Sequence, residues 1–126
     1  MKDSVCVDFD GVIAVNDGWQ GVEHFGDLIP GAKEFLDALS EMYNVIIFTC
    51  RCTEGMNGIE KSNLLVNRVR DYMDEHELKY DEIYAGQGKP IAKAYIDDRG
   101  IYCNPALDSL AYAKVLLMLG AMDKKE

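Results

Sequence analysis

Apolar residues occur along this chain in two alternating patterns: short continuous runs, and longer segments with a helical period. A short apolar run bounded by turn residues is typical of a strand that is covered on both faces. Such runs predict strands at residues 5–9 and 45–48, and two shorter segments, 81–85 and 94–96, are expected to be the third and fourth strands.

The segments with helical spacing predict three helices. The first begins near Pro30, whose missing N–H costs nothing in a first turn. The second spans residues 59–77. The third begins at Pro105 after a capping Asn104, and its inner stripe is expected to be Leu107, Leu110, Ala111, Val115 and Met118.

The order of these segments predicts the fold class. Strands that alternate with helices favour an α/β protein with a central parallel sheet and helices on both faces, a three-layer Rossmann-like arrangement. The chain has 126 residues, which is typical of a single domain, so residues 1–126 are expected to form one unit.

Residues 12–29 follow neither pattern. They hold three glycines and the only tryptophan, Trp19. A long connection without regular structure is often functional. We expect this segment to form a small hairpin or flap over the end of the first strand.

Polar side chains gather where the predicted strands end. In open parallel sheets, ligands bind outside the carboxyl ends of the strands, so these side chains are expected to meet in one crevice. They are Asp8 and Asp10 after the first strand, Thr49, Cys50 and Arg51 after the second, Lys89 before the fourth, and Asp97 and Asp98 after the fourth.

The residue types in this crevice indicate phosphate chemistry. Clustered carboxylates without a His or Cys ligand set suit a hard cation such as Mg²⁺, which usually shares its shell with a phosphate. An aspartate can also accept a phosphoryl group as a nucleophile. Asp8 and Asp10 point to the same side if the strand persists, about 6.6 Å apart along it.

Four motifs resemble a known family. VCVDFDGV, IIFTC, GKP and YIDDR resemble, in order, the four sequence motifs of the haloacid dehalogenase (HAD) superfamily, and the match runs from Val5 to Arg99. The resemblance implies a HAD-like fold in which 12–29 is the flap. The short connections leave no room for a cap domain, so the chain resembles the capless members.

The resemblance also implies roles for the candidate residues. Asp8 would be the nucleophile and Asp10 the general acid and base of a Mg²⁺-dependent phosphohydrolase. The phosphate would be held by Thr49, Cys50, Arg51 and Lys89. The metal would be bound by Asp8, Asp10, Asp97 and Asp98; which of the last two touches the ion directly is open.

An open site would accept a phosphorylated small molecule or the phosphorylated end of a larger substrate. Two other interpretations are a receiver-like phospho-signalling module and a phosphate- or Mg²⁺-binding module without turnover. The acceptor Asp of a receiver ends its middle strand, where this chain has Thr49, and the order of motifs therefore favours hydrolysis. The roles of Trp19, His24 and Arg51 are left open by the sequence.

Charge and hydropathy limit the partners. The formal net charge is −9, from 22 acidic and 13 basic residues, which does not favour nucleic acid as a partner. No apolar run is long enough for a membrane helix, and the N-terminus lacks the apolar stretch of a secretory signal, so a cytoplasmic location is expected. A second subunit could cover an open site, so a homo-oligomer is consistent with the sequence.

Overall fold

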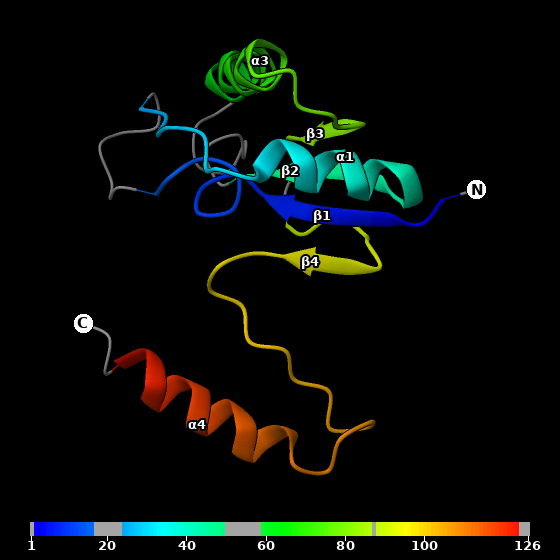
Figure 1. The fold of residues 1–126 in the computed structure, drawn as a ribbon, viewed down its shortest axis with the longest axis vertical. Helices are drawn as coiled ribbons and strands as arrows, with labels where there is room; N and C mark the ends of the chain where they lie inside the picture. The colour runs from blue at the N-terminus through cyan, green and yellow to red at the C-terminus, as the bar shows by residue number, and fades with distance from the viewer. Residues whose placement is uncertain (1, 17–23, 50–58, 87, 124–126) are drawn as a thin grey trace.

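The computed structural model describes residues 2–16, 24–49, 59–86 and 88–123. Strands and helices alternate from β1 to β3, whereas β4 follows β3 with no helix in the described residues between them (Figure 1). In chain order the elements are β1 (Ser4–Asp8), α1 (Ala32–Met42), β2 (Asn44–Phe48), α3 (Ile59–Glu75), β3 (Glu82–Tyr84), β4 (Ala94–Ile96) and α4 (Ala111–Asp123). The α/β class is confirmed, and each of the four strands lies within one residue of its predicted bounds.

The strands form one parallel sheet in the order β3-β2-β1-β4. The strand β1 lies in the middle, paired with β2 on one side and β4 on the other. Its Val5, Cys6 and Val7 are all buried, which explains the continuous apolar run in the sequence. The parallel order brings the carboxyl ends of β1, β2 and β4 to the same edge.

One face of the sheet carries the hydrophobic core. Val7 of β1 and Ile47 of β2 point to this face, where Leu36 of α1 and Leu65 and Val69 of α3 cover them. All five of these side chains are fully buried. Both α1 and α3 therefore lie on the same side of the sheet, as right-handed crossovers between β1, β2 and β3 require.

The opposite face is different. Cys6 and Ile46 alternate with the core residues and point to this second face, outside the core cluster. Among the described residues, no helix packs on it, and α4 stands apart from the sheet (Figure 1). The expected three-layer arrangement is therefore present as two layers, a sheet and one layer of helices, with α4 separate.

The last helix begins later than its sequence predicts. Asn104 closes a single turn, accepting backbone hydrogen bonds from Leu107 and Asp108, but α4 starts only at Ala111. The side chain of Asp108 accepts a hydrogen bond from the Leu110 N–H at 2.9 Å and so caps the helix at this later point. The prediction of a start at Pro105 was wrong, because the Asn104 turn does not continue and the helix begins after the Asp108 cap.

The predicted inner stripe of α4 was also wrong for most of its members. Ala111 is buried and Val115 is half-buried, but three of the five side chains are largely exposed: Leu107, Leu110 and Met118.

The other two helices are close to expectation. The helix α1 begins at Ala32 rather than Pro30, because Gly31 has a φ of +92° and cannot belong to the helix. The helix α3 ends at Glu75, two residues before the predicted end. Glu77 then adopts a φ of +56° and turns the chain away.

The two ends of segment 12–29 lie antiparallel beyond the tip of β1. The Val15 N–H donates to the Asp27 carbonyl at 2.7 Å, and the Ile29 N–H donates to the Ile13 carbonyl at 2.8 Å. Ala14 bridges to Leu28 in the same antiparallel sense. This pairing has the form of a hairpin and places the segment next to the carboxyl edge of the sheet.

Candidate functional site

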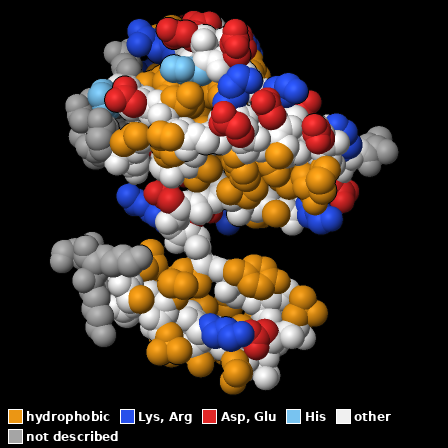
Figure 2. Space-filling view, in the orientation of Figure 1, with side chains coloured by type: hydrophobic (Ala, Val, Ile, Leu, Met, Phe, Trp, Pro, Cys, Tyr) orange, Lys and Arg blue, Asp and Glu red, His pale blue; other side chains and the backbone are white. Residues whose placement is uncertain are grey.

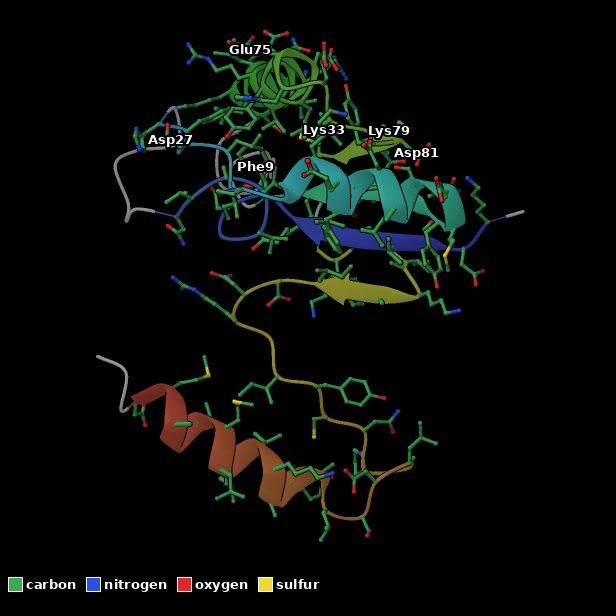
Figure 3. All side chains as sticks on the ribbon, in the orientation of Figure 1. Phe9, Asp27, Lys33, Glu75, Lys79 and Asp81 are labelled. Carbon is green, nitrogen blue, oxygen red and sulfur yellow. The ribbon has the colours of Figure 1, made fainter. Side chains whose placement is uncertain are left out.

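Asp8 and Asp10 lie where the central strand ends. Asp8 is the last residue of β1, and the chain then turns tightly, with the Ile13 and Ala14 N–H groups both donating to the Phe9 carbonyl at 3.0 Å. Phe9 itself is fully buried and is labelled beside the tip of β1 in Figure 3. The buried ring anchors the turn, so both carboxylates are held at the strand end.

Thr49 joins this turn from the neighbouring strand. It follows β2 directly, is 2% exposed, and its Oγ1 donates a hydrogen bond to Asp10 Oδ2 at 3.2 Å. The Phe9 N–H also donates to the Phe48 carbonyl, which extends the pairing of β1 and β2 to the edge. Two of the predicted site residues are therefore in direct contact.

The acidic pair after β4 comes to the same edge. Val7 pairs with Ile96, so the residues that follow them, Asp8 and Asp97, lie on adjacent parallel strands. Asp98 packs against Gly11, where a Cβ would collide with its Oδ2. Gly11 has a φ of +90°, so this position in the DFDG motif needs glycine both for its backbone and for the approach of Asp98.

Asp97 and Asp98 point in different directions. Asp97 Oδ1 accepts hydrogen bonds from the N–H groups of Arg99, at 2.9 Å, and of Gly100, so this oxygen closes its own loop. Asp98 instead faces the turn after β1. Of the two acids, Asp98 is the one directed at Asp8 and Asp10.

The clustered acids perturb Asp8. Burial and the negative charges of Asp98, Asp10 and Asp97 raise the pKa of Asp8 from 3.8 to about 7. The carboxylate is thus held among like charges that would favour a nearby cation. A strongly raised carboxyl pKa beside several other acids is typical of a functional site rather than of a structural ion pair.

Lys89 lies on the second face of the sheet. Its Nζ is 4.9 Å from the centre of the Tyr95 ring, a cation–π contact that no pattern in the sequence indicates. Tyr95 pairs in register with Cys6, two residues before Asp8 on the same face. Burial and the charges of Asp8 and Asp97 raise the pKa of Cys6 to about 11, with Lys89 acting in the opposite direction.

The donor chemistry at this edge fits Mg²⁺. The described acids supply only carboxylate oxygens, from the ends of two adjacent strands, and the raised pKa of Asp8 reflects negative charge that a divalent cation would offset. Within the described residues, no three His, Cys, Asp or Glu side chains are already grouped as a metal-binding set. The residues that would hold the ion are Asp8, Asp10 and Asp98.

Some predicted residues cannot be placed. Cys50, Arg51 and Trp19 lie outside the described residues. His24 is described and is half-buried in the segment over the site. The predictions for Cys50 and Arg51 therefore stay predictions.

Tyr72 supports the site and was not predicted from the sequence. Its hydroxyl donates to the Gly26 carbonyl at 2.9 Å, which ties the segment over the site to α3. Its ring packs edge-on against Phe9 and Phe25, with centroids 5.1 and 5.9 Å away. A phenol within an apolar helical stripe needs a partner for its hydroxyl, and that need was the signal available in the sequence.

A separate cavity lies at the other edge of the sheet. It has a volume of about 490 Å³ and is lined by residues that include Ser40, Lys79 and Asp81. Asp81 Oδ2 accepts a hydrogen bond from the N–H of Val45, near the start of β2, whereas Thr49 follows the end of that strand. Figure 3 shows Lys79 and Asp81 well away from Phe9, so this cavity is not part of the acidic site.

The comparisons with known proteins do not assign the chain to a family. No protein-family model matches the chain, and no curated protein matches it in sequence. None of the helices in the described ranges has the length and apolar character needed to cross a membrane.

Proposed function

We propose that this chain is a Mg²⁺-dependent phosphomonoesterase of the HAD type, acting through an aspartyl-phosphate on Asp8. The fold expected for that family, a Rossmann-like sheet without a cap domain, is compatible with the four parallel strands. The substrate class is a phosphorylated small molecule or the phosphorylated end of a larger molecule.

One observation carries the proposal. Four polar side chains gather at the carboxyl edge of three adjacent parallel strands: Asp8 at the end of β1, Asp10 just after it, Thr49 after β2 and Asp98 after β4. This edge is where open α/β sheets bind ligands, and the residue types are those that hold a cation and a phosphate.

The reaction would run in two steps. An Asp8 carboxylate oxygen attacks phosphorus, the bond from phosphorus to the leaving oxygen breaks, and Asp10 donates a proton to that oxygen. Asp10 then takes a proton from water, whose oxygen attacks phosphorus. The bond to Asp8 breaks and inorganic phosphate leaves.

Asp8 must be ionised to attack. With a pKa of about 7, it is only about half ionised at neutral pH in the absence of a cation. Bound Mg²⁺ would supply positive charge that lowers this pKa and neutralises phosphate oxygens. The repulsion between the Asp8 carboxylate and its acidic neighbours, which is unfavourable in the unliganded site, thus favours the binding of a divalent cation.

Asp10 is positioned for proton transfer by Thr49. The hydrogen bond of 3.2 Å between them fixes the Asp10 carboxyl beside the strand end. The Thr49 hydroxyl has one proton, so once it donates to a phosphate oxygen of bound substrate, its oxygen would instead accept a hydrogen bond from the protonated Asp10 carboxyl. Lys89 would add positive charge from the second face.

The test is hydrolysis of p-nitrophenyl phosphate with Mg²⁺ and with EDTA, on the wild type, on Asp8→Asn, and on Asp71→Asn. Asp71 is an exposed acid on α3, so Asp71→Asn makes the same chemical change away from the site. We expect turnover that needs Mg²⁺, is lost in Asp8→Asn and is kept in Asp71→Asn. Metal-dependent turnover that survives in Asp8→Asn would contradict the aspartyl-phosphate route.

A second measurement distinguishes the proposed phosphatase from a module that binds Mg²⁺ or phosphate without turnover. Mg²⁺ should raise the melting temperature of the wild type, since it binds only the assembled carboxylates. A thermal shift without hydrolysis of any phosphomonoester would favour the binding module. If Mg²⁺ causes no thermal shift and no phosphomonoester is hydrolysed, the proposed Mg²⁺ and phosphate site is refuted.

A further inference from the structure

The helix α4 is apolar on all sides. Its sequence AYAKVLLMLGAMD contains only two charged residues, Lys114 and Asp123. Helical geometry puts Val115 and Met118 on one side of α4 and Leu116 and Leu117 on the opposite side. A helix with apolar residues all round is typical of one that is buried on more than one side.

In the structure of one chain this helix is exposed. Leu116 and Leu117 are 71% and 75% exposed, and Tyr112 is 69% exposed. Orange side chains cover much of the visible surface around α4, which forms a separate body in Figure 2. The least exposed part is the first turn, where Ala111 is buried.

The exposed apolar surface is large enough for a protein interface. Nine large apolar side chains between Tyr102 and Met122 are exposed. Six of the nine lie on α4, and at roughly 100 Å² each they present on the order of 600 Å² of apolar surface. A standard stable interface buries about 800 Å² per partner, apolar and polar surface together, so α4 can supply most of one partner's share.

Three kinds of surface could cover α4. A membrane surface selects helices with separate polar and apolar faces, which α4 lacks, and the net charge of −9 opposes anionic lipids. The second face of the same sheet could cover one side of α4 and would leave the other side exposed. A second copy of this chain brings another helix of the same character, which can cover the side that carries the exposed Leu116 and Leu117.

We propose that α4 is the contact element of a homodimer, in which the side of α4 that carries Leu116 and Leu117 packs against α4 of a second copy. The contact is symmetric, so each apolar side meets an equal one. This inference does not depend on the proposed phosphatase activity.

The test is the mass of the full chain in solution, measured by light scattering and sedimentation from nanomolar to high micromolar concentration. We expect the wild type to have twice the 14.1 kDa mass of one chain at micromolar concentration. A wild type that stays monomeric up to high micromolar concentration would overturn the proposal.

Variants place the contact on α4. Leu116→Lys/Leu117→Lys should shift the chain to monomer, raising the dissociation constant by at least a hundredfold. The control Leu64→Lys changes an exposed leucine on α3 and should remain dimeric. Leu116→Gln/Leu117→Gln repeats the test with uncharged residues of good helix propensity, in case the lysines impair folding.

Two results would contradict the proposed role of α4. If the double variants stay dimeric while their circular dichroism matches the wild type, α4 does not form the contact. If the wild type is monomeric and sediments with anionic phospholipid vesicles, α4 is a membrane-binding element instead, and the homodimer is refuted.

Discussion

The acid cluster should destabilise the folded chain when no cation is bound, and Asp8→Asn should relieve this. The pKa of Asp8 is raised from 3.8 to about 7 in the folded state. A raised pKa means that the proton binds the folded state more tightly. The associated stability is fully present below about pH 4 and is lost as the pH rises through about 7.

The size of the effect follows from the pKa difference. A shift from 3.8 to about 7 corresponds to at most about 4 kcal/mol in the free energy of unfolding. Asp8 is only half-buried, so solvent screening reduces the contribution to about 1–2 kcal/mol. For a chain of this length, that gain would raise the melting temperature by roughly 3–8 °C.

The assay is urea unfolding at about pH 8 and at about pH 4, without divalent cations, on the wild type, Asp8→Asn and Asp71→Asn. Asparagine resembles a protonated carboxyl group, so Asp8→Asn should be more stable than the wild type at the higher pH and nearly equal at the lower. Millimolar Mg²⁺ should stabilise the wild type and not Asp8→Asn. An equal gain at both pH values, or none at the higher, would refute the electrostatic reasoning.

Two further changes test the geometry around the site. Gly11→Ala should lower the free energy of unfolding by about 1–3 kcal/mol and weaken the stabilisation by Mg²⁺, because φ is +90° and the Cβ would displace Asp98. The control Gly88→Ala, at a φ of +76° with open space around it, should cost only the backbone strain and keep the stabilisation by Mg²⁺. Equal stabilisation by Mg²⁺ in the two variants would contradict the contact between Gly11 and Asp98. Tyr72→Phe should cost about 1 kcal/mol in urea unfolding by removing the hydrogen bond to Gly26, and an unchanged midpoint would show that this bond does not secure the segment.

The two central strands, β1 and β2, were predictable because side chains that are buried on both faces leave a continuous apolar run. Val5 to Val7 and Val45 to Ile47 are apolar at every position, and every one of these side chains is buried. The parallel direction of β1, β2 and β3 then follows from the helices between them, since parallel strands need crossovers. The sequence pattern therefore predicts the sheet and the edge where the acids meet.

The last helix was harder to predict for two reasons. Both Asn104 and Asp108 can cap a helix, and a sequence pattern does not say which cap wins when the segment has little tertiary contact. A helix that is apolar on all sides also has no single apolar stripe. The sequence pattern therefore gave no physical reason to expect Leu107 and Leu110, rather than other apolar residues, to be buried.

The sequence could predict which strand ends carry polar side chains, but not the contacts that these side chains make. Sequence order placed Asp8, Asp10 and Thr49 at neighbouring strand ends, but the hydrogen bond between Thr49 and Asp10 depends on side-chain rotamers. Likewise, nothing in the sequence IDDR indicates that Asp97 turns to its own loop while Asp98 faces Gly11.

The turn at Asp97 is held by its own hydrogen bonds, so the start of the 97–110 connection does not depend on the position of the residues that follow it. Because Asp97 Oδ1 holds the N–H groups of Arg99 and Gly100, the first turn after β4 is tied to itself rather than to α4. The ten residues from 101 to 110 can then act as a tether that absorbs movement of the helix. A rearrangement of α4, whether on assembly or on dissociation, would therefore leave Asp98 in place beside Gly11, and the acidic site would keep its geometry in either state.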